Sequence, residues 1–187
     1  MEAFSDGVIA VIITIMVLEL KVPHSTDLAA LREILPVFLT YVLSFIMLGI
    51  YWNNHHHLLH ATKGITSGIM WANLHLLFWL SLIPFFTGWL GENHDATWPT
   101  AMYGVVLLMA AIAYFILQSL IVAHHGKDSK LAEAIGSDLK GKISIASYAL
   151  AVVCAWFVPS ISDALYVFVA IIWVVPDRRT HSAVRSS

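Results

Sequence analysis

The sequence predicts an all-α fold, a polytopic membrane protein with six transmembrane helices and hardly any part outside the bilayer. Three observations lead to this prediction. Hydrophobic residues make up 59% of the 187 residues and charged residues only 12%, which is about half the charged share of a soluble domain. Apolar stretches recur along the chain, and a bilayer crossing needs about 20 such residues. Basic residues gather in alternate loops between these stretches.

Short loops separate the predicted spans. We place the spans at about residues 4–22, 35–54, 69–90, 100–123, 143–158 and 163–175. An amphipathic helix over residues 28–34 leads into the second span, and residues 159–162 form the loop between the last two. No loop could hold a soluble domain, so residues 1–187 are expected to form a single six-helix membrane domain. The apolar start at Phe4 lacks a basic leader, so we expect a retained helix and not a signal peptide.

The basic side chains predict the orientation. With six spans, both termini lie on one side of the membrane, and that side receives eight basic residues: Lys63, Lys127, Lys130, Lys140, Lys142, Arg178, Arg179 and Arg185. The other side receives only Lys21 and Arg32. Because cytoplasmic loops carry an excess of lysine and arginine, both termini are predicted to be cytoplasmic. A formal net charge of −2 without a basic run argues against nucleic acid as a partner.

The first span is the most informative stretch. It opens with the carboxylate of Asp6, closes with that of Glu19, and is otherwise branched aliphatic with one hydroxyl. Spacings of three and four residues put three apolar side chains on one helix face, with the hydroxyl beside it: Val11, Ile15, Leu18 and Thr14. In the simplest interpretation Ser5 caps the helix, Asp6 favours the positive end of its dipole, and the apolar face meets lipid. A carboxylate inside the span would instead indicate function.

Several stretches of the chain match a known family. Phe4-Ser5-Asp6-Gly7, followed by the apolar run at residues 10–20, resembles the first-helix motif of the transmembrane protein 175 family of potassium channels. Tyr51-Trp52-Asn53-Asn54-His55-His56 is similar to the end of its second helix. Residues 71–74 and 80–87 resemble its third helix, and residues 173–179 resemble its closing segment. The resemblance covers nearly the whole chain.

The resemblance implies a potassium-selective ion channel. The prokaryotic members are homotetramers of six-helix subunits in the cell membrane, with the first helix of each subunit lining a central pore. K⁺ would be the permeant ion, monovalent cations the ligands, and no cofactor would be needed. Matched by position, Val11, Ile15 and Leu18 would form the pore constriction, and Thr14 would assist selectivity just behind it.

The resemblance also implies a polar network at the cytoplasmic end of the first helix. It joins a basic residue, the serine and the aspartate to a second-helix histidine, which here gives Ser5, Asp6 and either His55 or His56. The family's basic residue stands four positions before the phenylalanine, which is one position before Met1. Either the chain lacks this basic residue or the protein begins before Met1, and the network is incomplete in the sequence given.

An apolar constriction is physically compatible with potassium selectivity. The sequence has no Thr-Val-Gly-Tyr-Gly loop for carbonyl coordination, but hydrophobic constrictions can gate a pore by dewetting. A larger, weakly hydrated cation gives up water more readily, which favours potassium over sodium. Glu19, near the outer mouth, would raise the local cation concentration. Alternatively, Glu19 is a solvated charge at a helix end.

The histidines offer a second possible site. Four of them form the densest group of possible metal ligands: His55, His56, His57 and His60. His56 and His60 are four residues apart and share a helix face, as zinc-binding pairs do. No acidic ligand accompanies them in the sequence, so we expect no metal and a hydrogen-bonding role. Asn73 and His75, in the third span, are expected to hydrogen-bond neighbouring helices.

Other functions stay open at this level. A proton or non-selective monovalent-cation leak could use the same apolar neck. An intramembrane metal- or haem-dependent enzyme would use the histidine cluster, and a structural subunit would carry no flux. The residues favour the channel over the enzyme.

Overall fold

A computed structural model describes residues 1–23, 26–62, 64–126 and 138–174. The fold of these residues is all-α. In chain order the helices are α1 (Glu2–Ile15), the short 3₁₀ helix η1 (Met16–Glu19), α2 (Leu28–Glu33), α3 (Leu35–His60), α4 (Ser67–Glu92), α5 (Thr97–His125), α7 (Leu139–Cys154) and α8 (Pro159–Val174).

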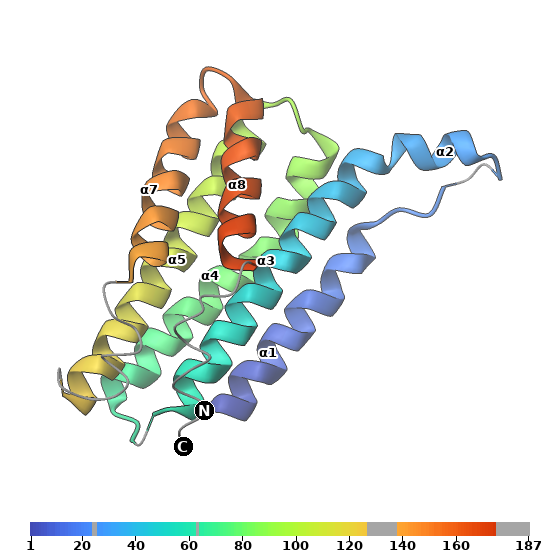
Figure 1. The fold of residues 1–187 in the computed structure, drawn as a ribbon. Helices are drawn as coiled ribbons and strands as arrows, with labels where there is room; N and C mark the ends of the chain where they lie inside the picture. The colour runs from blue at the N-terminus through green and yellow to red at the C-terminus, as the bar shows by residue number, and fades with distance from the viewer. Residues whose placement is uncertain (24–25, 63, 127–137, 175–187) are drawn as a thin grey trace.

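The helices form a bundle in which α1 occupies one edge. Figure 1 shows α1 running alongside α3, with α7 and α8 toward the opposite side and α2 projecting from the end of α3. α4 packs against α1, α3 and α5, and α5 packs against α7 and α8. Among the long helices, the first helix therefore makes its main contacts with α3 and α4.

The six predicted spans are each occupied by a helix. Within the described residues, three helices are long and apolar enough to cross a membrane: α3, α4 and α5, with 26, 26 and 29 residues. The first span divides into 14 α-helical and four 3₁₀ residues, which together reach roughly 29 Å, close to the roughly 30 Å of a bilayer core. The predicted lead-in helix is α2.

The hairpin between the last two spans differs from the prediction. Pro159 to Ser162 were expected to be its loop, but α8 begins at Pro159. The turn lies earlier, after α7 ends at Cys154. The physical reason is that proline suits the first helical position, where no backbone donor is needed and its fixed φ is already helical. Val175, the predicted end of the last span, lies outside the described residues.

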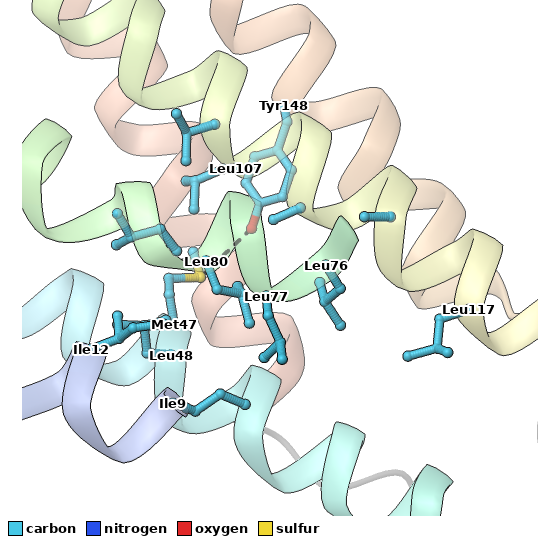
Figure 2. Packing of buried hydrophobic residues seen from close by; sticks show 14 of the residues in the cluster. Ile9, Ile12, Met47, Leu48, Leu76, Leu77, Leu80, Leu107, Leu117 and Tyr148 are labelled. Atoms are coloured by element: carbon cyan, nitrogen blue, oxygen red, sulfur yellow. Dashed lines mark hydrogen bonds between the residues drawn. The ribbon is translucent and has the colours of Figure 1, made fainter. Parts of the chain in front are cut away.

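The core lies where α3, α4, α5 and α8 meet. Figure 2 shows leucines of α3, α4 and α5 interdigitating. The large buried phenols each have a partner: Tyr148 donates to the Met47 sulfur at 3.6 Å, and Tyr166 donates to the Thr100 carbonyl at 2.8 Å. α1 adds Ile9 and Ile12 to this core, and η1 adds Met16. Within the described residues, the first helix packs into the bundle through one side.

Candidate functional site

The outward side of the first helix carries the predicted pore residues. Val11, Ile15 and Leu18 are 55%, 43% and 78% exposed in the part of the chain that the structure describes. Val11 and Ile15 are one α-helical turn apart. Leu18 belongs to η1, whose tighter winding aligns residues three apart, so it extends the stripe beyond Ile15. The structure therefore brings the three side chains into one exposed apolar stripe.

Thr14 lies beside this stripe, and a hydrogen bond fixes the direction of its hydroxyl group. Its Oγ1 donates a hydrogen bond to the Val11 carbonyl at 2.9 Å. The proton is thus directed back into the helix, and the oxygen keeps acceptor capacity for another group. The Thr14 side chain is exposed. It is the one hydroxyl on this side of α1 and can accept a hydrogen bond or contact a cation.

An open groove separates the stripe from α4. Gly7, Val11 and Ile15 line one wall of it, and Pro84 and Phe85 line the other. The groove is mainly apolar, which suits lipid or a neighbouring helix equally well.

Glu19 stands at one end of the groove. Its carboxylate lies close to the backbone of Gly88 in α4, where an added Cβ would come 3.1 Å from Oε2. The Glu19 side chain is exposed. The carboxylate is therefore held at the end of the first helix that is opposite to Asp6.

A buried chain of hydrogen bonds ties the other end of α1 to α3 and α4. His55 Nε2 lies 2.6 Å from the side-chain Oδ1 of Asn73, an amide oxygen that can only accept, so Nε2 is the donor. Asn73 donates to Ser5 Oγ at 2.9 Å, and Ser5 donates to the Met1 carbonyl at 3.1 Å. Ser5, His55 and Asn73 are buried. Among the described residues, His55 Nδ1 has no hydrogen-bond partner.

Asp6 and His56 belong to a second polar group on the same two helices. Trp52 donates to Asp6 Oδ1 at 3.1 Å, and His56 Nδ1 lies 3.3 Å from Asp6 Oδ2. Glu2 joins them, with its Oε1 3.3 Å from His56 Nδ1 and 3.7 Å from His60 Nδ1. The predicted network is thus two groups: Ser5 pairs with His55 through Asn73, and Asp6 pairs with His56.

Sequence reasoning missed three members of these groups. Asn73 was expected to bond a neighbouring helix, which is confirmed, but its place between Ser5 and His55 was not predicted. Trp52 precedes His56 by four residues and Glu2 precedes Asp6 by four, so helical spacing offered a signal for both. His75 accepts a hydrogen bond from Trp79 within its own helix at 2.9 Å, a bond that the sequence analysis did not predict.

Known proteins resemble this chain over its whole length. A family described as endosomal/lysosomal potassium channel TMEM175 matches residues 1–84. A potassium channel from Chryseobacterium sp. (strain P1-3) is 53% identical over 187 residues, which is all of this chain and 97% of that protein. The chain belongs to the TMEM175 family. This confirms the family that the first-helix motif indicated.

A solved structure of the TMEM175 family shares the fold. The crystal structure of a lysosomal potassium-selective channel TMEM175 homolog from Chamaesiphon minutus superposes with a TM-score of 0.82 at 26% identity, covering 93% of this chain and 94% of that one. The endosomal/lysosomal proton channel TMEM175 of Danio rerio is 39% identical over 75 residues, only 14% of its own length. The TMEM175 family is one of ion channels, so the expectation that the chain is not an enzyme is confirmed.

Proposed function

We propose that the chain is the subunit of a potassium-selective channel in which four copies surround a central pore lined by α1. The observation that carries the proposal is the exposed stripe of Val11, Ile15 and Leu18 on a helix that otherwise packs into the bundle. Two relatives named as potassium channels support potassium as the permeant ion. Both termini would be cytoplasmic, and each subunit would be one six-helix domain.

The stripe becomes a set of rings when four copies meet around an axis. A closed cyclic assembly repeats each side chain at one height, so Val11, Ile15 and Leu18 each give an apolar ring. Water leaves such a neck readily, and an ion passes only when the rings separate enough to admit partial hydration. The cost of losing water is greater for sodium than for potassium, which favours potassium.

Polar groups at three heights complete the proposed pathway. The Thr14 oxygen, which keeps its acceptor capacity, would stand in for water just behind the Val11 and Ile15 rings. Glu19 would draw cations to the outer mouth. At the cytoplasmic end, Ser5, Asp6, His55 and His56 bond α1 to α3 and α4 and would fix how far the first helix leans toward the axis.

Single-channel recording in planar bilayers tests the rings. Val11→Asn and Ile15→Asn each place an amide in the neck, which lowers the cost of hydrated passage. We expect the potassium-to-sodium permeability ratio to fall about tenfold, equivalent to about 1.4 kcal/mol. Val153→Asn is the matched control, because Val153 on α7 is 56% exposed against 55% for Val11. Unchanged ratios in both pore variants would contradict the assignment.

Cysteine labelling distinguishes an aqueous pore from a lipid-facing surface. Cys154 is the only cysteine of the chain, so a Cys154→Ser background is simple to prepare. In that background, Val11→Cys should react with a membrane-impermeant thiol reagent and lose current, while Val153→Cys should not. If both cysteines are equally protected from the reagent, the stripe faces the acyl chains of the lipid.

Thr14 can be tested without disturbing the apolar rings. Thr14→Val keeps the shape and removes the oxygen, whereas Thr14→Ser keeps the oxygen. We expect a lower potassium-to-sodium permeability ratio in Thr14→Val and a ratio near wild type in Thr14→Ser, measured from reversal potentials. Equal ratios in the two variants would remove Thr14 from the selectivity mechanism.

Proton conduction is the second candidate, favoured by the vertebrate relatives that are named as proton channels. Liposomes that enclose a pH-sensitive dye, with potassium-free solution on both sides, test it directly. A protein-dependent fall in the internal pH reported by the dye would favour proton conduction. A pH change that appears only when a potassium gradient is imposed would favour potassium conduction.

A further inference from the structure

We propose that Glu2, Asp6, His56 and His60 form a binding site for a divalent transition-metal cation of the zinc class. The site lies between the first turns of α1 and the last turns of α3. Its binding can be measured on the purified protein without any current, so the proposal does not rest on conduction. The sequence alone offered no acidic ligand beside the histidines, whereas the fold supplies two.

The spacing of the ligand atoms matches one small ion. Glu2, Asp6 and His56 each offer one atom, and these atoms all lie within 4.8 Å of one another. His56 Nδ1 is 3.3 Å from both Glu2 Oε1 and Asp6 Oδ2. Zinc bonds of about 2.0–2.2 Å to nitrogen and oxygen place neighbouring tetrahedral ligands about 3.3–3.6 Å apart. The two contacts therefore have the length of tetrahedral edges.

Among the described residues, hydrogen bonds satisfy this group only in part. A single N–H at His56 Nδ1 can point at one carboxylate, yet two carboxylate oxygens stand at the same 3.3 Å. That separation exceeds the roughly 2.7–2.9 Å of a charge-assisted hydrogen bond. A cation between the three atoms would contact all of them and would offset the repulsion between the two carboxylates.

Two neighbours complete the arrangement. Trp52 donates to Asp6 Oδ1, which leaves Oδ2 directed at His56, and such hydrogen bonds commonly orient metal ligands. His60 Nδ1 is 3.7 Å from Glu2 Oε1, and its side chain is 79% exposed, so it can turn to supply a fourth ligand. Two imidazoles and two carboxylates favour zinc-class ions over magnesium or calcium, which select oxygen ligands.

The dipole of α1 explains only part of this cluster. A helix N-terminus favours carboxylates, which accounts for Glu2 and Asp6. It does not account for His56 and His60, whose imidazoles lie one turn apart on the facing helix α3. The pairs at residues 2 and 6 and at residues 56 and 60 face each other across the α1–α3 contact.

A bound ion would act on the first helix from behind the exposed stripe. Glu2 and Asp6 lie on the side of α1 that contacts α3, whereas Val11 and Ile15 lie on the exposed side. The ion would therefore join α1 to α3 at one end without entering the proposed pore. Joining the two helices would limit the movement of α1 that widening of the rings requires.

The test uses the purified full chain in detergent, stripped with a chelator and titrated with Zn²⁺. We expect one saturable site per chain by calorimetry and a rise in the thermal unfolding midpoint. His56→Gln and Glu2→Gln should each weaken binding by at least about tenfold, and Trp52→Phe, which removes a bond to a ligand, by about tenfold. His57→Gln is the matched control, an exposed histidine of α3 outside the cluster, and should bind as wild type. Mg²⁺ should not displace the ion.

Three results would overturn the site. They are the lack of saturable binding in wild type, wild-type affinity in Glu2→Gln, and an equal loss of affinity in His57→Gln. Glu2→Gln decides the case if His56→Gln fails to fold, because the Glu2 side chain is 36% exposed and its loss leaves the core intact.

Discussion

The two sides of α1 are similar in composition and opposite in environment. Ile9 and Ile12 on the inner side are 0% and 5% exposed, while Val11 and Ile15 on the outer side are 55% and 43% exposed. Both sides are branched aliphatic. The inner side contacts α3 and α4, as the labelled residues Ile9 and Ile12 in Figure 2 illustrate.

This difference separates two reasons for an apolar residue in a membrane protein. On the inner side the residue fills space between helices, so its loss should change stability. On the outer side it is free of its own subunit, so its loss should change what the assembly does. Composition does not distinguish the two, because lipid, a pore and a core all select apolar side chains. Substitution at matched positions does.

The largest expected effect compares neighbours on opposite sides. Ile12→Asn removes a buried side chain and buries an amide, which should lower the free energy of unfolding by about 3–5 kcal/mol. Val11→Asn should change the free energy of unfolding by no more than about 0.5 kcal/mol, as exposed substitutions generally do. Thermal unfolding in detergent, followed by fluorescence-detected gel filtration, measures both. Equal destabilisation by the two variants would mean that the sides of α1 are not distinct.

Two glycines give the next contrast. At Gly104 in α5 an added Cβ would lie 2.2 Å from the hydroxyl oxygen of Tyr166, a rigid side chain already bonded to Thr100. Gly104→Ala should cost about 1–3 kcal/mol through overpacking. At Gly7, on the outer side of α1, nothing lies within 4 Å. Gly7→Ala should stabilise the helix by up to about 1 kcal/mol. A cost at Gly7 in the assembled protein would reveal a neighbouring copy against this side.

The buried hydrogen bonds at the start of α1 should matter less than its apolar packing. Asn73→Leu removes the bonds to Ser5 and His55. Since interhelical bonds in membranes contribute about 0.6 kcal/mol on average, we expect a loss of about 1–2 kcal/mol in the unfolding free energy. Asn93→Leu is the control, because Asn93 lies exposed just after α4 and, among the described contacts, its side chain bonds only the Trp89 carbonyl. The control should unfold at the wild-type temperature. An equal loss of stability in Asn93→Leu would mean that the buried hydrogen bonds of Asn73 make no specific contribution.

Much of this fold could be predicted from the sequence, because the bilayer strongly restricts the structures that a membrane-spanning chain can adopt. Apolar length and the basic loops predicted six spans, and helices occupy all six. One boundary was predicted wrongly because the signals there compete. Pro159 was taken as the first residue of a loop and in fact begins α8, since proline is common both just after a helix and at its first position.

The candidate functional site could be predicted from the sequence only in part. The motif at Phe4-Ser5-Asp6 indicated the family and hence the stripe, and spacing of three and four placed Val11 and Ile15 on one side. Contacts between helices have no such local signal. Glu2 and His56 are far apart in the chain and meet only because α1 packs along α3. Distances across helices depend on packing, which a single sequence does not display.

The smallest expected effect lies at the opposite end of the first helix. Lys21, just beyond η1, pairs with Glu92 at the end of α4, with Nζ 2.5 Å from Oε1. The side chains are 80% and 50% exposed, so water and salt screen their attraction, and holding two long side chains costs conformational entropy. Glu92→Gln should therefore leave the thermal midpoint at the wild-type value at both low and high salt. A fall at low salt that disappears at high salt would show that this exposed pair, like the buried bonds at the other end, holds α1 to α4. The first helix would then be fixed at both of its ends, and its outer side could widen a pore only by moving together with α4.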